Sequence, residues 1–281
     1  MKSKKILVLG ATGMLGRVVF KYFLEKKSIT TLGTSRTKNE NLFLLDVREK
    51  KSLKKIMDQA GNIDFIINCV GTLKSNPSKD YSINYILPNH LEKLQKKYKF
   101  KLINISTDDV FNPFSGEVNE ICSPSPNNPY AKSKIRGEVS SNFSINIRTS
   151  IIGFDPEGKK GLIEFLKKNK KVNGYIDQIW SGCTTLQFAR LCDYLMNNNN
   201  FTKLRRKTNV AHFTPLGPIT KYELLKKISK TLMLKTRFVK YKSNEKIDRI
   251  LTSIYFDKKF LQRYTTEIDQ ALTDLQKFEK S

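Results

Sequence analysis

The sequence predicts an α/β protein in which a doubly wound parallel sheet is followed by a smaller, mostly helical lobe. Short apolar runs rich in β-branched residues alternate with amphipathic stretches through the first half of the chain. The first run, residues 6–9, leads directly into a glycine turn, as a buried strand does. Apolar strands that alternate with helices are typical of a parallel sheet covered by helices on both faces.

Each element is placed by its own pattern. Six short apolar runs predict strands at residues 5–10, 28–33, 41–46, 64–71, 101–107 and 144–150. Amphipathic spacing between them predicts helices at residues 15–27, 50–60 and 84–98. A further helix should begin at Pro129, because proline suits the first helical position.

The alternation changes after about Gly153. A loop rich in glycine, proline and charge covers residues 153–161. Later helices are expected at residues 162–171, 185–196, 221–232 and 267–278, with a strand-like run at 209–214 and an asparagine loop at 197–200. We therefore expect a sheet domain over residues 1–153 and a second lobe over residues 154–281, partly interleaved with the first.

The chain is strongly basic, with a formal net charge of +25 from 51 lysines and arginines and 26 aspartates and glutamates. The excess is spread along the chain as lysine pairs on expected helix surfaces, and asparagine is also abundant, which favours codon bias as the cause. No DNA-reading motif accompanies the charge, so we expect no nucleic-acid partner. The positive field would attract an anionic substrate or cofactor.

Cysteine and histidine usage argues against a metal centre. The four cysteines lie far apart without a CxxC pair, and the chain has two histidines, so neither a zinc site nor a disulfide framework is indicated. No apolar run is long enough to cross a bilayer, and the first residues do not resemble a signal peptide. We expect a soluble, cytoplasmic protein with free thiols and no membrane partner.

The turn after the first strand carries three glycines in the order Gly10-Ala-Thr-Gly13-Met-Leu-Gly16. The first permits the tight turn, the second lets backbone N–H groups approach a pyrophosphate, and the third lets the helix pack closely on the strand. The turn therefore predicts a Rossmann-type dinucleotide site, with an empty structural turn as the alternative. The other predicted cofactor residues of this turn are Thr12, Met14 and Leu15.

The end of the second strand favours NADP over NAD as the cofactor. An acidic side chain there would accept hydrogen bonds from the ribose 2′-OH of NAD, but this sequence has Ser35 and Arg36. A hydroxyl and a guanidinium suit a 2′-phosphate, and the guanidinium also offers a flat surface to adenine. The alternative is a solvated arginine on a loop, so NAD stays open.

Two further strand ends are expected to contact the adenosine. Asp46 and Val47 close the third strand, where the carboxylate could meet the adenine amino group. Cys69, Val70 and Gly71 close the fourth, where a turn of small residues could pass the ribose. Aspartate and asparagine also cap helices routinely, so a structural role is the alternative at both positions.

Tyr130 and Lys134 lie four residues apart on the helix expected from Pro129, and therefore on one face. A free tyrosine has a pKa of about 10, and a nearby ammonium should lower the pKa of Tyr130 by stabilising tyrosinate. Such a pair alone is common on surface helices. Here Thr107 ends the fifth strand, at the carboxyl edge where parallel sheets bind ligands. Its hydroxyl could hold a carbonyl while Tyr130 delivers a proton and NADPH a hydride.

These motifs resemble those of the extended short-chain dehydrogenases, specifically the dTDP-4-dehydrorhamnose reductase-like branch. The matching segments are GATGMLG, NCVG, STDDVF, PYAKSKIRGE, IRTSIIG and, more diffusely, FTPLGPITKYELLKKI with the C-terminal helix. The likeness covers nearly the whole chain. It implies an NADPH-dependent reduction of the keto group of a dTDP-, UDP- or GDP-linked 4-keto-6-deoxy sugar, in the synthesis of surface polysaccharide precursors.

The resemblance also implies roles for individual residues. Thr107, Tyr130 and Lys134 would form the catalytic trio, with Asp108 near the nucleotide-sugar substrate. Arg148 would border the nicotinamide or sugar pocket, with further contacts from residues 172–185. Within that segment Trp180 would stack on a sugar or base, or else pack inside the lobe. A homodimer is a further expectation.

The sequence departs from the family pattern in two places. Asp109 replaces the tyrosine that often precedes VF, and the loop IDQIWSGCTT lacks the proline-threonine pair of the rhamnose enzymes. The second departure leaves the sugar open. Two alternatives remain: a nucleotide-sugar 4,6-dehydratase or epimerase on the same scaffold, and a non-catalytic, dinucleotide-binding regulatory subunit like that of methionine adenosyltransferase.

Overall fold

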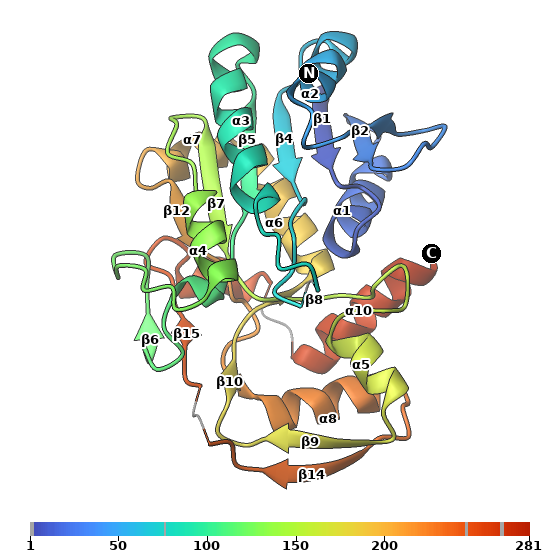
Figure 1. Cartoon of the computed structure of the whole chain (residues 1–281), viewed down its shortest axis with the longest axis vertical. Coiled ribbons are helices and arrows are strands. Elements are labelled where there is room, and N and C mark those ends of the chain that lie inside the picture. The colour runs from blue at the N-terminus through green and yellow to red at the C-terminus, as the bar shows by residue number, and fades with distance from the viewer. Residues whose placement is uncertain (1–2, 76, 245–246, 265–266) are drawn as a thin grey trace.

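The computed structural model describes residues 3–75, 77–244, 247–264 and 267–281, and its centre is a seven-stranded sheet with strand order β12-β7-β5-β4-β1-β2-β3 (Figure 1). In that order the strands are Val210–His212, Ser144–Arg148, Lys101–Ile105, Phe65–Asn68, Lys4–Leu9, Ile29–Ser35 and Phe43–Leu44. Every neighbouring pair is parallel. The chain order runs outward in both directions from β1, so the predicted doubly wound α/β fold is confirmed.

All six predicted strands lie in this sheet, and the seventh, β12, comes from the strand-like run after residue 153. The third strand is shorter than expected. It covers only Phe43–Leu44, and Asp46 lies beyond its end. The reason is that β3 is the edge strand and pairs with β2 alone, through two residue pairs.

Helices cover both faces of the sheet (Figure 1). The long covering helices are α1 (Met14–Leu24), α2 (Lys50–Ala60), α3 (Ile83–Tyr98) and α6 (Thr185–Met196). Alternate residues of β1 supply both cores. Ile6 and Val8 pack with residues of α1 and α6, whereas Leu7 and Leu9 pack with residues of α2 and α3. All four side chains are fully buried, which explains the unbroken apolar run of this strand.

The second lobe has its own apolar core. Its main elements are α5 (Leu162–Lys168), β9 (Lys171–Tyr175), α8 (Lys221–Thr231), β14 (Arg237–Tyr241) and α10 (Ile268–Lys280). The core between them includes Ile163, Leu224 and Leu272. The parallel pair of β9 and β14 was not predicted. Most of β14 is exposed, so it lacks the alternation of apolar residues that marks a strand in a sequence.

Helix α10 connects the lobe to the sheet domain (Figure 1). Glu279 forms an ion pair with Arg17 of α1, and Lys21 of α1 donates to the carbonyl of Phe278 at 2.7 Å. On its other side Lys227 of α8 pairs with Asp269 at 2.9 Å. The C-terminal helix therefore contacts both the helix that follows the glycine turn and the main helix of the second lobe.

The remaining elements are short. They are η1 (Asp108–Val110), β6 (Glu117–Val118), α4 (Pro129–Arg136), β8 (Ile151–Ile152), β10 (Ile179–Trp180), β11 (Cys183–Thr184), α7 (Asn200–Arg205), β13 (Ile219–Thr220), β15 (Ile250–Leu251) and α9 (Lys258–Gln262). The expected asparagine loop ends in a helix, because α7 already begins at Asn200. Within the described residues, no helix has both the length and the apolarity to cross a bilayer, and no three potential metal ligands gather.

Candidate active site

The turn after β1 lets a helix N-terminus come close to a phosphate group. Gly10 has a φ of +76°, and the N–H of Gly13 donates to its carbonyl at 3.0 Å. A Cβ at Gly16 would overlap that same carbonyl oxygen. Helix α1 begins at Met14, and no side chain of the described residues caps its first turn. The N–H groups of this turn therefore suit a pyrophosphate, and the residues fit a dinucleotide. The other two predicted residues here are Thr12, which is exposed, and Leu15, which is buried.

The ends of β2 and β3 lie side by side at the same edge of the sheet. Ser35 is buried and its hydroxyl accepts from the N–H of Thr37 at 3.2 Å, while Arg36 is exposed beside it. Asp46 is also exposed, and its carboxylate accepts from the N–H of Arg48 at 2.9 Å. Val47 packs partly on the core beneath α2. The Arg36 side chain is thus exposed at this edge of the sheet, and its contact with a 2′-phosphate stays a prediction.

The loop after β4 touches the glycine turn. A Cβ at Gly10 would make a tight 3.0 Å contact with the side chain of Val70, and the positive φ of Gly10 independently favours glycine here. Cys69 is half-buried before it, and Gly71 follows. The segments predicted to bind the pyrophosphate and the adenosine ribose therefore meet at the carboxyl edge of β1 and β4, where the strand order reverses.

Tyr130 and Lys134 lie on helix α4, which begins at Pro129 as expected. Asn128 caps the helix by accepting from the N–H of Ala131 at 2.9 Å. The ammonium of Lys134 is buried and donates to the carbonyl of Ile105, the last residue of β5, at 2.6 Å. Thr107 follows β5. The Thr107 hydroxyl and the two α4 residues, Tyr130 and Lys134, therefore lie at the same carboxyl edge of the sheet.

The electrostatic environment of Tyr130 differs from the expectation. Burial raises its pKa to about 12; a hydrogen bond with Thr107 opposes the rise, and the nearby carboxylates Asp108 and Asp109 add to it. Burial likewise lowers the pKa of Lys134 to about 8. The ammonium of Lys134 is directed at a carbonyl, so the expected lowering of the tyrosine pKa is wrong for this structure. Tyr130 is protonated at neutral pH, the form that can give a proton to a carbonyl.

Asn84 was missed by sequence reasoning and connects the two halves of the site. It is almost fully buried near the start of α3. Its side chain pairs with the backbone of Thr72 through bonds of 2.7 and 3.1 Å, and it donates to the hydroxyl of Ser133 at 3.0 Å. It thereby joins the loop after β4 to the helix of Tyr130. A polar residue in the first turn of an otherwise amphipathic helix was the available signal.

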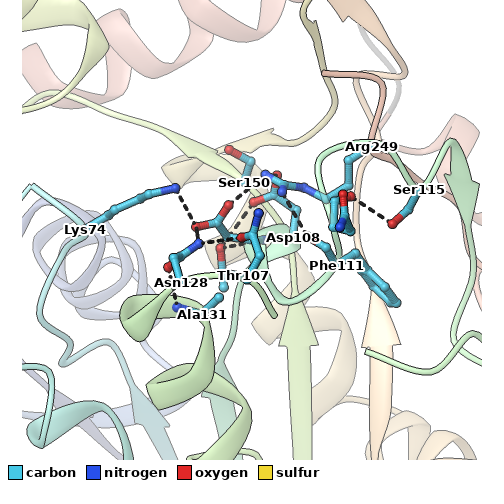
Figure 2. Close-up of polar contacts among 12 residues, drawn as sticks. Lys74, Thr107, Asp108, Phe111, Ser115, Asn128, Ala131, Ser150 and Arg249 are labelled. Atoms are coloured by element: carbon cyan, nitrogen blue, oxygen red, sulfur yellow. Dashed lines mark hydrogen bonds and ion pairs between the residues drawn. The ribbon is translucent and has the colours of Figure 1, made fainter. Parts of the chain in front are cut away.

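Two neighbouring carboxylates, Asp108 and Asp109, follow Thr107 and share one arginine; Figure 2 labels Asp108 and that arginine, Arg249. Arg249 lies 3.2 Å from the carboxylate of Asp108 and 3.0 Å from that of Asp109. Asp109 also pairs with Lys74 at 3.1 Å. Despite burial, these cations hold the pKa of Asp109 below its usual value. Arg249 and Lys74 were not among the predicted site residues, since neither lies in a motif.

Arg148 and Trp180, the other predicted substrate residues, both have partners within the protein. Arg148 is buried and forms a two-point ion pair with Glu138 at 2.9 and 2.7 Å. The indole N–H of Trp180 donates to the hydroxyl of Ser150 at 2.8 Å. Trp180 also lines a cavity of about 510 Å³ in the second lobe, whereas contact of Arg148 with a ligand stays a prediction.

That cavity combines apolar and cationic side chains. Besides Trp180, its lining includes Phe165, Tyr175, Lys171 and Lys221. Burial lowers the pKa of Lys221, and the charges of the Asp108–Asp109–Arg249 cluster act on it as well. Lys221 is therefore within electrostatic reach of the acidic pair, while the residues that line the cavity come from the second lobe. A ligand with a flat ring and a negative charge suits such a lining.

Comparison with known proteins identifies a family match across most of the chain. Residues 4–266 match the family described as the RmlD substrate binding domain. The methionine adenosyltransferase 2 subunit beta of Xenopus laevis is 34% identical over 144 residues, which are 48% of this chain and 42% of that protein. A dTDP-4-dehydrorhamnose reductase of Mycobacterium tuberculosis is 27% identical over 148 residues, covering 49% and 45%. The match thus spans less than half the length of these relatives.

Solved structures resemble the fold over the whole chain. A dTDP-4-dehydrorhamnose reductase from Clostridium acetobutylicum superposes with a TM-score of 0.77 at 19% identity, covering 99% of this chain and 100% of that one. A reductase of the same name from Bacillus anthracis, in complex with NADP, has a TM-score of 0.73 at 19% identity, covering 97% and 98%. At such identities the likeness bears on the fold alone.

Proposed function

This chain belongs to the RmlD substrate binding domain family, within the extended short-chain dehydrogenases, and on that premise we propose that it is an NADPH-dependent reductase of a nucleotide-linked keto sugar. One observation carries the proposal. Tyr130 and Lys134 lie on a helix against the end of β5 and next to Thr107, and the Lys134 ammonium also lies near the loop after β4 that touches the glycine turn. This arrangement can hold a dinucleotide and a carbonyl at the same edge of the sheet.

The protein side of the reaction is a proton transfer. NADPH, when bound, supplies the hydride that reduces the carbonyl carbon. Tyr130 gives its phenolic proton to the carbonyl oxygen, Thr107 holds that oxygen through its hydroxyl, and the tyrosinate recovers a proton from solvent. Lys134, whose ammonium bonds the carbonyl of Ile105, would hold the nicotinamide ribose when the dinucleotide is bound. The raised pKa of Tyr130 supports the reductive direction, because the phenol is protonated before each turnover.

Arg36 supports NADPH as the cofactor. Its exposed guanidinium at the end of β2 could pair with a 2′-phosphate and stack on adenine. The similar reductase from Bacillus anthracis is described in complex with NADP, which agrees with this choice. The similar Bordetella bronchiseptica protein WbmH is described in complex with NAD+, so NAD remains an alternative cofactor.

The substrate would occupy the second lobe, which we propose as residues 154–281 next to a cofactor domain of residues 1–153. Trp180 could stack on the base or sugar, and Lys221 could meet a phosphate, since both line the cavity of the second lobe. A dTDP-, UDP- or GDP-linked 4-keto-6-deoxy sugar combines these features. This substrate would make the protein part of surface polysaccharide precursor synthesis.

The alternatives differ in what they require of the site. A 4,6-dehydratase needs both an acid and a base beside the sugar, and Asp109 is a poor acid because Arg249, Lys74 and Asn128 favour its ionised form. A regulatory role is favoured by the methionine adenosyltransferase 2 subunit beta relatives. That role would need the dinucleotide fold but no turnover, and it would make a second protein the partner.

A turnover assay separates these functions. Purified protein is offered NADPH with a panel of nucleotide-linked 4-keto sugars, and the products are identified by mass spectrometry. A reductase consumes one NADPH for each sugar reduced, whereas a dehydratase leaves NADPH unchanged overall. Failure to reduce any member, together with a stoichiometric protein partner in a pull-down, would favour the regulatory role. A nucleotide sugar without a keto group is the control substrate.

A further inference from the structure

We propose that Asp109 is a positioning residue for Tyr130, because it joins Arg249, which directly precedes β15, to Asn128, the cap of helix α4. The inference rests on the proposed function only in naming Tyr130 as the proton donor. Asp109 stands where related sequences often carry tyrosine, so the family pattern does not account for it. Its contacts with Lys74, Asn128 and Arg249 account for it, and Figure 2 labels these three partners.

The carboxylate of Asp109 is enclosed by three donors. One oxygen accepts from the ammonium of Lys74 and from the side-chain N–H of Asn128, both at 3.1 Å. The other lies 3.0 Å from the guanidinium of Arg249. Asp109 is only 8% exposed and the Arg249 side chain 10%, so the bond between them is shielded from water, whereas the Lys74 side chain is largely exposed. A buried carboxylate with this many donors is held in a single orientation.

Asn128 connects the Asp109 carboxylate to the first turn of helix α4, which carries Tyr130. Its amide nitrogen donates to Asp109, which leaves the amide oxygen facing the N–H of Ala131 at 2.9 Å. Helix α4 has only eight residues, so its first turn depends on this cap more than that of a long helix would. Tyr130 lies two residues after the cap, within that first turn.

Arg249 connects a later segment of the sequence to Asp109. It directly precedes β15, which pairs with β6, and its guanidinium also donates to the carbonyl of Phe111 at 3.0 Å. The side chain is 10% exposed. The position of Arg249 and β15 is thereby linked, through Asp109 and Asn128, to the position of the Tyr130 hydroxyl.

The first test is Asp109→Asn, which keeps the shape and removes the charge. We expect kcat for keto-sugar reduction to fall by about tenfold or more, because a small displacement of a proton donor is costly, while the KM for the sugar changes little. The N–H of Ala131 should exchange with solvent about fivefold faster, because the cap is weakened. Asp58→Asn is the matched control, since Asp58 is an exposed carboxylate on α2 paired with Lys97.

The second test reverses the hydrogen bond between the two side chains. Asn128→Asp alone retains a good cap but faces Asp109 with a second carboxylate, so kcat should again fall. In the double variant Asp109→Asn with Asn128→Asp, the amide and the carboxylate have changed places and the bond can form again. We expect the double variant to recover most of the lost kcat and the slow exchange at Ala131. The single Asn128→Asp variant also keeps the test possible should Asp109→Asn not fold.

The outcomes separate this inference from the proposed function. Loss of kcat with faster exchange in Asp109→Asn, both restored in the double variant, supports the positioning role. Unchanged kcat and exchange, or a loss that the double variant does not restore, overturns it. If wild-type protein reduces no keto sugar, yet exchange at Ala131 responds as described, the positioning of helix α4 stands and the proposed function fails.

Discussion

The ammonium of Lys134 donates to the carbonyl of Ile105 at 2.6 Å, so the lysine of helix α4 is bonded to the end of β5. Thr107 lies two residues further along the same strand end. The bond therefore sets the distance between the Tyr130 helix and the hydroxyl proposed to hold the substrate carbonyl. It also explains why Lys134 is buried although lysine seldom is.

The depressed pKa of Lys134 predicts that NADPH binding weakens at alkaline pH. Burial lowers this pKa to about 8, and the Glu138 carboxylate opposes the shift. Above that pH the free protein loses the ammonium that would contact the ribose, so the Kd for NADPH should rise. Calorimetric titrations of NADPH into wild type and Lys134→Met, at pH values below and above about 8, measure this change in Kd. The variant should bind more weakly throughout and show no such pH dependence, whereas Lys132→Met, an exposed position on the same helix, should behave as wild type.

The same group predicts a change in stability with pH. The folded-state pKa lies below the ordinary value of 10.5, so between about pH 8 and that value the unfolded chain binds one proton more than the folded chain. The contribution of Lys134 to the free energy of unfolding should therefore increase with pH in this window. Urea denaturation of wild type and Lys134→Met at several pH values measures this contribution as the difference between the two free energies of unfolding. Parallel curves for the two proteins would contradict the assignment.

Three buried asparagines form a ladder across the middle of the sheet and predict a large stability effect. Asn104 of β5 lies opposite Asn68 of β4 and Asn146 of β7, with amide hydrogen bonds of 2.9 Å on each side. Asn104 also donates to the carbonyl of Gly137 at 3.0 Å. Asn104→Leu would remove the acceptor of the Asn68 side-chain N–H and the donors to Asn146 and Gly137, although Asn146 keeps its bonds with Val139 and Asn209. We expect a cost of about 2 to 4 kcal/mol in the free energy of unfolding.

Chemical denaturation measures the Asn104→Leu effect. Asn62→Leu is the control, because Asn62 is exposed and its replacement should change stability by less than about 0.5 kcal/mol. A loss in Asn104→Leu no larger than that of the control would mean that the ladder is not needed for stability.

Arg36→Glu tests the cofactor assignment. A carboxylate would repel the 2′-phosphate of NADPH but could accept hydrogen bonds from the ribose of NADH. The Kd for NADPH should rise by at least about tenfold, or about 1.4 kcal/mol, while that for NADH stays similar or falls. Titration calorimetry with both cofactors measures the difference. An unchanged NADPH affinity would identify Arg36 as a solvated loop residue.

Much of the fold was visible in the sequence because each strand of the parallel sheet is a local apolar run. Residues 6–9 illustrate this, since burial on both faces demands apolar side chains at every position. The glycine turn and the Pro129 helix were equally local. By contrast, β14 is mostly exposed and carries little periodicity, and β3 is limited by its place at the edge of the sheet.

The site was less predictable where it depends on contacts between distant segments. Arg249 contacts Asp109 because β15 pairs with β6, a strand distant from it in the sequence. Neither residue type nor spacing indicates that contact. The pKa of Tyr130 was misjudged for a related reason: the four-residue spacing places Lys134 on the same helix face, but the ammonium is bonded to Ile105.

The most direct test of the proposed chemistry is the turnover of Tyr130→Phe with a nucleotide-linked keto sugar that the wild type reduces, at saturating NADPH. The variant lacks only a hydroxyl, so its folding and NADPH affinity should be preserved, and Tyr98→Phe on the surface of α3 is the matched control. Without the proton donor, kcat should fall by about 10²- to 10⁴-fold. If Tyr130→Phe instead turns over as fast as the control variant, Tyr130 is not the proton donor and the proposed mechanism is wrong.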